Sequence, residues 1–292
     1  MIWVIGEILM DEFPAYRRVG GAPFNFACHL KRMGLPVRFV SRVGKDETGR
    51  SILRFVEEHG FRPDDIQVDA DHPSGTVQVT LDDSGVPDYI IHSQVAYDFL
   101  DLSEWISRLK SGAVPRMIYY GTLLQRTPQA FDRVKALLRS RNQGTAAFCD
   151  LNLRMHCYHR KSVLHSLHQA DYLKLNEEEL GIVADFTRTD GESFDPRNLL
   201  SRFAVKAVIV TRGKEGSEWI SRDAHVSSKP PGNIEATDTV GAGDAHAAMS
   251  AYGILNEWTP ERTIALADRL AARICQIQGA LPDADIYSDL IR

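Results

Sequence analysis

Short, mostly apolar runs recur along the chain and alternate with longer segments in which apolar residues follow helical spacing. Runs of this kind are typical of strands buried on both faces of a parallel sheet. We expect strands at 2–5, 37–43, 117–120, 146–149, 172–175 and 208–210, and helices near 128–140, 161–170, 177–184 and 196–204. The alternation predicts an α/β fold with a central, mostly parallel sheet flanked by helices on both faces.

One stretch has a different pattern. Residues 76–81 alternate between apolar and polar side chains, residues 82–85 are turn formers, and residues 89–91 continue the strand pattern. This pattern predicts a hairpin with one solvent-exposed face, and therefore a small sheet beside the main one. The chain has no internal repeat, low-complexity tract or linker rich in Gly, Ser or Pro, so we expect a single domain over residues 1–292.

Composition restricts the partners. A net charge of −5 provides no broad positive surface for nucleic acid or an anionic membrane. The apolar start at 1–6 is too short for a signal peptide, and no apolar run approaches the ~20 residues that span a bilayer. The four scattered cysteines suit a reducing compartment. We therefore expect a cytoplasmic protein that binds small molecules.

A glycine-rich turn at 238–244 carries the strongest chemical signal. Gly241 and Gly243 bracket Ala242, Asp244 closes the turn, and residues 245–251 are predicted to be helical. Backbone N–H groups that converge at a helix N-terminus bind anions such as phosphate. One hypothesis is that Asp244 takes a proton from a hydroxyl that attacks the phosphate. The alternative, on this segment alone, is that Asp244 merely caps the helix.

Polar groups near the N-terminus form a second candidate site. Glu7 and Asp11 follow the first predicted strand, and in open α/β sheets ligands bind outside the carboxyl ends of strands. Gly20 and Gly21 precede a predicted helix, where glycine lets a ligand approach the backbone closely. Asn25 in the first turn can contact a ligand hydroxyl. A solvated loop carboxylate and an exposed helical amide remain the alternatives for Asp11 and Asn25.

Five motifs, in order along the chain, resemble those of the ribokinase/PfkB family of carbohydrate kinases. They lie at 20–27 (Gly-Gly-Ala-Pro-Phe-Asn-Phe-Ala), 43–49, 176–179 (Asn-Glu-Glu-Glu), 211–216 and 238–244. The resemblance covers about residues 2–283. It implies a ribokinase-like fold with a small β-sheet lid, whose strands are inserted at about 12–20 and 73–96.

The resemblance also implies transfer of the γ-phosphoryl group of Mg·ATP to a hydroxyl of a small sugar. Asp244 would be the general base, and the N–H groups of Gly241, Ala242 and Gly243 would form the anion hole. The implied acceptor contacts are Asp11, Gly20, Gly21, Asn25 and Arg154. The implied nucleotide contacts are Asn176, Thr211, Gly213, Gly216, Gly241 and Gly243. Glu179 and Asn176 would hold Mg²⁺ through water. A monovalent cation such as K⁺, and a homodimer through the lid sheet, are left open.

Three segments are most similar in amino-acid sequence to fructokinases: Gly6–Asp11, Gly20–Pro23 and Ala96–Asp98. D-Fructose is therefore the leading acceptor, with ribose, 2-keto-3-deoxygluconate, a nucleoside and a sugar phosphate as alternatives. The chain departs from the family at His246, where relatives usually carry a large aromatic residue. We expect His246 to replace that residue in packing rather than to act in catalysis.

Two other classes of protein are disfavoured by the same motifs. A dinucleotide-binding oxidoreductase is disfavoured because His246 occupies the place of the third small residue of its glycine motif, and because the motif lies late in the chain. A catalytically weak kinase that serves as a sugar sensor would be expected to lack the base or the acid of the 176–179 motif. Both Asp244 and Glu179 are present.

Overall fold

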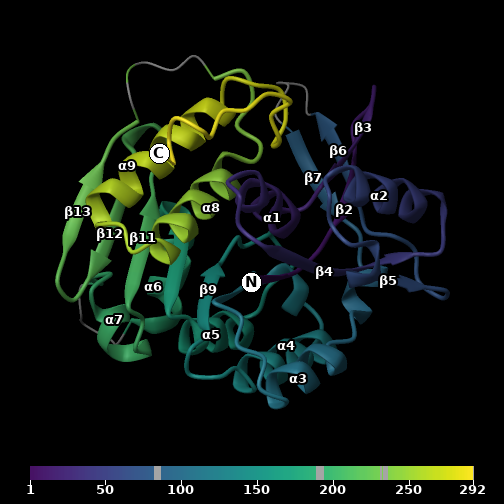
Figure 1. Ribbon diagram of the computed structural model, residues 1–292, viewed down its shortest axis with the longest axis horizontal. Helices are drawn as coiled ribbons and strands as arrows, with labels where there is room; N and C mark the ends of the chain where they lie inside the picture. Colours follow the sequence, from purple (N-terminus) through teal and green to yellow (C-terminus); the bar gives the residue numbers. More distant parts are fainter. Residues whose placement is uncertain (82–86, 189–193, 231, 233–235, 292) are drawn as a thin grey trace.

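The computed structural model describes residues 1–81, 87–188, 194–230, 232 and 236–291. Within these residues nine strands form one large sheet in the order β13-β12-β11-β10-β9-β8-β1-β4-β5 (Figure 1). Its strands are β1 (Ile2–Ile5), β4 (Val37–Gly44), β5 (Ile66–Asp69), β8 (Met117–Tyr120), β9 (Ala146–Asp150), β10 (Tyr172–Asn176), β11 (Ala207–Thr211), β12 (Ser217–Ser221) and β13 (His225–Ser228).

The large sheet is parallel from β5 through β11, and antiparallel where β12 and β13 are added at one edge. The predicted α/β class with a mostly parallel sheet is confirmed. All of the apolar runs fall on parallel strands. The strands β5, β12 and β13 were not predicted. β5 and β13 are the two edge strands, and β12 lies next to β13. β13, for example, alternates exposed and partly buried residues and so lacks the run of apolar residues that marks a strand covered on both faces.

Helices cover both faces of the large sheet (Figure 1). The side chains of β1 show this directly, because successive residues of a strand point to opposite faces. Trp3 and Ile5 pack with α3–α7, whereas Ile2 and Val4 pack with α1, α2, α8 and α9. The helices are α1 (Ala22–Arg32), α2 (Glu47–Glu58), α3 (Ser103–Lys110), α4 (Pro128–Arg139), α5 (Arg160–Gln169), α6 (Glu177–Thr187), α7 (Asn198–Phe203), α8 (Ala242–Leu255) and α9 (Pro260–Ile274).

A small separate sheet has the order β3-β2-β6-β7 and stands on the right in Figure 1. Its strands are β2 (Leu9–Glu12), β3 (Arg17–Gly20), β6 (Thr76–Leu81) and β7 (Pro87–Ile91). β6 and β7 pair antiparallel, as the alternating pattern predicts, and β2 joins β6 in parallel. The predicted turn at 82–85 lies outside the described residues. The small sheet thus combines two stretches of chain that are far apart in sequence.

Short connections join several of these elements. β1 continues through residues 6–8 into β2, so the chain passes from the large sheet to the small one in three residues. The 3₁₀ turns η1 (Pro63–Asp65), η2 (Ala96–Phe99), η3 (Leu123–Gln125) and η4 (Gly213–Glu215) form shorter connections. Across the described part of the chain, no helix has both the length and the apolar character needed to cross a membrane.

Candidate active site

The glycine turn forms the N-terminus of α8. Gly241 is the N-cap residue, with φ of +81°, and a Cβ there would lie 2.3 Å from the Cβ of Ala280. Only glycine meets both conditions without strain. The N–H of Ala242 donates to Thr239 O at 3.3 Å, whereas the N–H groups of Gly243 and Asp244 have no acceptor within the helix. The turn therefore presents N–H groups at the positive end of the helix dipole.

Asp244 is the third residue of α8 and does not cap it, because Gly241 holds the N-cap position without a side-chain hydrogen bond. Its carboxylate Oδ2 accepts a hydrogen bond from Asn25 Nδ2 at 2.8 Å. Burial raises the pKa of Asp244, while the Asn25 hydrogen bond and the nearby charges of Lys174 and Arg154 lower it. The capping alternative for Asp244 does not describe this structure. The carboxylate instead faces the residues predicted to bind the acceptor.

Asn25 reaches Asp244 because α1 begins very close to the β1–β2 connection. Gly21, the N-cap of α1, has φ of +116°, and a Cβ there would lie 2.7 Å from Glu7 O. The Asn25 side chain is buried, and its Oδ1 has no hydrogen-bond partner among the described residues. The alternative of an exposed helical amide is therefore wrong. Asn25 holds Asp244 with one end of its amide and offers a free acceptor oxygen with the other.

Asp11 lies on β2 beside the same carboxylate. A Cβ on Gly20 would lie 2.4 Å from Asp11 Oδ2, so glycine at position 20 makes room for the side chain. Burial raises the pKa of Asp11 to about 6; Arg18 and Arg154 lower it, and Asp244 raises it further. These electrostatic couplings place Asp11, Asp244 and the exposed Arg154 around one region. The structure thus gathers all five residues predicted for the acceptor site.

A buried ion pair that the sequence reasoning missed lies beneath the glycine turn. Lys174 Nζ is 3.1 Å from Asp150 Oδ1, and the two side chains are 8% and 1% exposed. A Cβ on Gly243 would lie 3.3 Å from Lys174 Nζ. Desolvation lowers the pKa of Lys174, but Asp150 and Glu179 outweigh it and raise the pKa, so the ammonium is retained. The available signal was a lysine inside the otherwise apolar run at 172–175.

Asn176 and Glu179 form a capping box at the start of α6. Asn176 Oδ1 accepts from Glu179 N at 2.8 Å, and Glu179 Oε2 accepts from Asn176 N at 2.8 Å. Glu179 Oε1 also accepts from Leu153 N at 2.7 Å. This arrangement holds a buried carboxylate rigidly between the ends of β9 and β10, close to Lys174 and Asp150. The 176–179 motif therefore has a structural role, which is to cap the N-terminus of α6.

The fit of this carboxylate to Mg²⁺ can be judged from its contacts. Each Glu179 oxygen accepts one backbone N–H and retains a second lone pair. Among the described residues, no group of three or more His, Cys, Asp or Glu side chains is placed to hold a metal ion. The Glu179 oxygens fit a Mg²⁺ ion that is bound mainly by nucleotide phosphates and contacts the protein through water.

The predicted nucleotide turn at 211–216 joins β11 to β12. Gly216 is buried with φ of +92°, and a Cβ there would lie 1.9 Å from Ser228 O, so this glycine is needed for the turn itself. Gly213 is exposed, and a Cβ there would meet nothing within 4 Å. Arg212 pairs with Glu177 of α6 and, at 3.0 Å, with Glu218 of β12. The turn is therefore tied to the N-terminus of α6, which carries Asn176.

Arg18 is a further residue that the sequence reasoning missed. It stands opposite Asp11 in the β2–β3 pairing. Its Nη2 is 3.8 Å from Asp238 Oδ2, and a Cβ on Gly279 would lie 2.2 Å from its Nη1. Asp238 in turn accepts from Val240 N and Gly279 N, at 3.0 and 2.9 Å. Arg18 thus links the small sheet to the loop that supports the glycine turn.

His246 is buried between α8 and α9. Its Nε2 lies 3.3 Å from Asp268 Oδ1, and its Nδ1 lies 3.4 Å from Ser250 Oγ. The Asp268 contact joins α8 to α9, whereas Ser250 lies one turn further along α8 itself. The side chain fills a position in the helix pair, in agreement with its expected packing role.

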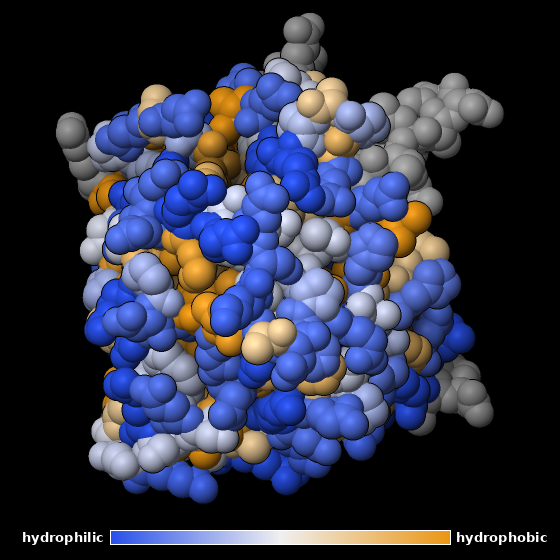
Figure 2. Space-filling view, turned by 90° about the vertical axis from the view of Figure 1, so that its right-hand side faces the viewer, coloured by the Kyte–Doolittle hydropathy of each residue, from blue (hydrophilic) through white to orange (hydrophobic). Residues whose placement is uncertain are grey.

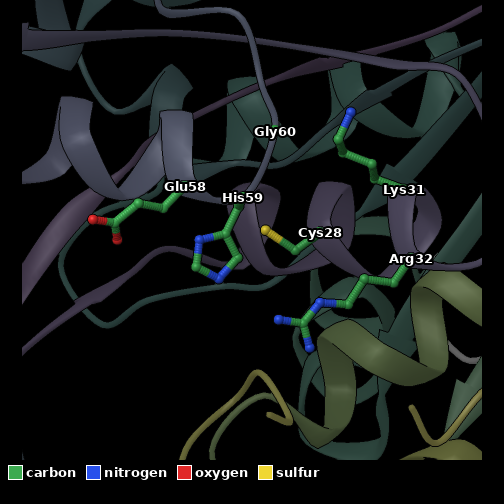
Figure 3. A pocket seen from close by; sticks show the side chains of 6 residues that line it. All are labelled: Cys28, Lys31, Arg32, Glu58, His59 and Gly60. Carbon is green, nitrogen blue, oxygen red and sulfur yellow. The ribbon is translucent and has the colours of Figure 1, made fainter. Parts of the chain in front are cut away.

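A cavity of about 490 Å³ lies elsewhere, between the C-terminal ends of α1 and α2 (Figure 3). Cys28, Lys31, Arg32 and His59 are among the residues that line it. Helix C-termini carry partial negative charge, which Lys31 and Arg32 offset. None of the predicted site residues lines this cavity, so we assign it no part in the chemistry.

Comparison with known proteins agrees with this arrangement. The chain is 26% identical to a fructokinase of Salmonella typhimurium, over 100% of this chain and 98% of that protein. It is 29% identical to a fructokinase of Klebsiella pneumoniae, over 96% and 92% of the two chains. Among solved structures, it resembles fructokinase with bound ATP from Xylella fastidiosa, with a TM-score of 0.81 and 20% identity over 96% and 93% of the chains. It also resembles the fructose, ADP and calcium ion bound form of fructokinase from Vibrio cholerae O395, with a TM-score of 0.78 and 22% identity over 96% and 94%. The model of the pfkB family of carbohydrate kinases matches residues 13–286. The chain therefore belongs to the pfkB family of carbohydrate kinases.

Proposed function

We propose that this sugar kinase transfers the γ-phosphoryl group of ATP to a hydroxyl of a neutral monosaccharide, with D-fructose as the leading acceptor. One observation supports the proposal above all others: a partly buried carboxylate, Asp244, is held by Asn25 in the first turn of α8, directly after the glycine turn. A base and an anion-binding helix terminus are thereby joined in one turn. The named relatives support fructose as the acceptor, since those compared are fructokinases.

In the proposed reaction, Asp244 accepts the proton of the acceptor hydroxyl as its oxygen attacks the γ-phosphorus. The bond from that phosphorus to the β–γ bridging oxygen breaks, and ADP leaves with the electron pair. The N–H groups of the glycine turn hold the transferring phosphoryl oxygens. The Lys174 ammonium beneath Gly243 adds positive charge there. Asn25, Asp11, Gly20, Gly21 and Arg154 orient the acceptor.

On the nucleotide side, we assign Thr211, Gly213 and Gly216 to the border of the nucleotide, next to Asn176. Glu179 and Asn176 would hold Mg²⁺ through water, and the bound ion would offset phosphate charge. The chain's own residues keep the site in shape: the capping box fixes Glu179, and Arg212 ties the nucleotide turn to α6. The assay described below also tests whether turnover depends on K⁺.

We assign the small sheet to the role of a lid that excludes water from the acceptor. The contacts of Arg18 with Asp238 and Gly279, which flank α8 and α9, support this role, because they link the sheet to the glycine turn. The same sheet is the proposed surface for a homodimer. Tyr16 and Ile90 are 42% and 47% exposed on or beside it. The side of the molecule on the right of Figure 1 is largely hydrophilic, with separate hydrophobic patches (Figure 2).

The test is ADP release from Mg·ATP with a panel of acceptors: D-fructose, ribose, 2-keto-3-deoxygluconate and a nucleoside, each with K⁺ or Na⁺. We expect turnover that is highest with D-fructose. Turnover with another panel member would correct the acceptor and keep the chemistry. Sugar binding without ADP release would replace the kinase proposal by the sugar-sensor alternative.

A further inference from the structure

Glu7 lies in the β1–β2 connection and is a buried acid, electrostatically coupled to Asp244, that the proposed reaction does not use. The residue is 3% exposed, and its Oε2 has no hydrogen-bond partner among the described residues. The backbone of Glu7 packs against Gly21 at the start of α1. Its charge interacts with those of Asp244 and Arg154, as the charge of Asp11 does. Glu7 therefore borders the region that Asp11 and Asn25 border.

Two oxygens at this site lack donors. Glu7 Oε2 and Asn25 Oδ1 are both buried, and neither has a partner among the described residues. A buried acceptor without a donor is costly, and native proteins rarely leave one. Water or a ligand hydroxyl can supply the missing hydrogen. Asn25 already binds Asp244, so a sugar hydroxyl that donates to Asn25 Oδ1 would stand at the reacting end of the acceptor, in the region to which Glu7 is coupled.

The charges around Glu7 are mixed. Arg154 and Arg126 lie near it on the positive side, Asp244 on the negative side, and the Tyr97 and Tyr119 hydroxyls complete the surroundings. Arg126 is already paired with Asp98, at 2.7 Å. Burial raises the pKa of Glu7 to about 7, Arg154 and Arg126 lower it, and Asp244 raises it further. Near neutral pH the carboxyl therefore changes between a form that only accepts hydrogen bonds and a form that can also donate one.

We propose that Glu7 is a specificity-determining residue of the acceptor site, whose buried Oε2 accepts a hydrogen bond from a hydroxyl of a neutral sugar. A phosphate or carboxylate group in that place has no hydrogen to donate and would face the carboxylate as a like charge. Glu7 thereby favours an uncharged polyhydroxy acceptor over a sugar phosphate or sugar acid. This inference rests on the proposed function, since it deepens the identity of the acceptor.

The test compares wild type with Glu7→Gln, which keeps an acceptor oxygen, and Glu7→Met, which keeps the length and removes both oxygens. Sugar binding is measured by calorimetric titration with D-fructose, or with whichever panel sugar is turned over, at pH 6, 7 and 8. Loss of a hydrogen bond to a charged group weakens binding by roughly tenfold or more. We expect Glu7→Met to raise the sugar Kd by about that factor at pH 8, with Glu7→Gln in between and ATP binding unchanged.

The pH series separates hydrogen bonding from a structural effect. A hydroxyl that donates to the carboxylate binds the ionised form better, so the wild-type Kd rises as pH falls from 8 to 6. Asp11, with a pKa of about 6, contributes to the same trend. The part due to Glu7 is therefore the difference between wild type and the variants, and both variants should show a flatter dependence.

Asp268→Asn is the matched control. Asp268 is also buried, and its Oδ2 also lacks a partner among the described residues, but it pairs with His246 on the far side of α8. We expect its sugar Kd and pH dependence to match wild type. Wild-type Kd and pH dependence in both Glu7 variants would overturn the inference and leave the kinase proposal intact. Absence of any sugar binding by wild type would instead overturn the proposed function, and this inference with it.

Discussion

Asn25 Nδ2 donates a hydrogen bond to Asp244 Oδ2 at 2.8 Å, although 219 positions separate the two residues in sequence. The bond joins the first turn of α1 to the first turn of α8, so two helix N-termini meet at one carboxylate. A hydrogen bond to the charged form favours ionisation and opposes the effect of burial on the pKa of Asp244. In the proposed reaction, Asn25 therefore tunes the pKa of the base as well as bordering the acceptor.

Asn25→Ala removes that donor, and the pKa of Asp244 should rise further above its ordinary value. The base must be deprotonated to act, so the acid limb of the kcat/KM profile should move to higher pH. At neutral pH we expect roughly a tenfold loss of kcat/KM, the value of one hydrogen bond to a charged group. The measurement is a pH–rate profile from pH 5 to 9. Asn142→Ala, which removes amide bonds to Leu109 O and Ala113 O outside the site, is the control. An acid limb that stays in place would contradict the tuning role.

Lys174→Met should lower both stability and turnover. It leaves Asp150 buried without its partner, which costs about 3–5 kcal/mol in unfolding free energy for such pairs. The double variant Lys174→Met/Asp150→Asn removes both charges and should regain most of that stability. Turnover should stay low in the double variant, because the ammonium next to Gly243 is still missing. Denaturant unfolding and ADP release are measured together. If the double variant regained wild-type turnover, Lys174 would have a structural role alone.

Gly241→Ala should lower kcat by more than tenfold, while the KM for the sugar stays close to wild type. The added Cβ would lie 2.3 Å from the Ala280 Cβ, so the glycine turn must shift. Gly34→Ala is the matched control: Gly34 has a similar φ of +84°, but a Cβ there meets nothing within 4 Å. Both variants carry the backbone strain of roughly 1 kcal/mol. Equal loss of kcat in the two variants would mean that strain, not displacement of the turn, is responsible.

Glu7→Gln should stabilise the protein above neutral pH. The folded-state pKa of about 7 lies above the ordinary value of 4.5, so the folded protein holds this proton more tightly than the unfolded chain. The carboxyl therefore destabilises the fold progressively from pH 4.5 to 7, reaching about 3 kcal/mol above pH 7. Glutamine removes this term. The measurement is thermal unfolding of wild type and Glu7→Gln at pH 4.5 and pH 8. We expect the variant to have a higher Tm than wild type at pH 8 and the same Tm as wild type at pH 4.5. If the variant and wild type had the same Tm at pH 8 as well as at pH 4.5, the pKa of Glu7 in the folded protein would be close to its ordinary value.

The large sheet could be predicted because its inner strands are covered on both faces. Burial of that kind appears locally as apolar runs, and each run from 2–5 to 208–210 coincides with a parallel strand. The edge hairpin β12–β13 could not be predicted in this way. Glu218 pairs with Arg212 and His225 on its solvent side, so the strand carries polar residues that the same pattern assigns to loops. The parallel pairing of β2 with β6 is a tertiary feature that no local pattern contains.

The site shows the same division. The glycine turn was visible because an anion-binding helix start needs small residues in immediate succession. Asn25 and Asp11 were visible as polar residues beside glycines, but their convergence on Asp244 depends on the fold. Glu7 was visible only as an acid that follows the first strand. Lys174 and Arg18 were missed, because their importance comes from burial and from partners on other elements. A sequence shows that a residue is charged, whereas the fold determines whether that charge is buried and what it faces.

The central claim is that Asp244 is the base that deprotonates the acceptor. The most direct measurement is the kcat of Asp244→Asn on the sugar that wild type phosphorylates, with ATP and sugar binding measured separately. Asparagine keeps the size of the side chain and cannot accept the proton, and removal of a general base costs roughly 10²–10⁴ in rate. We predict a loss of kcat in that range, with both substrates still bound. Turnover within a few-fold of wild type would contradict the account.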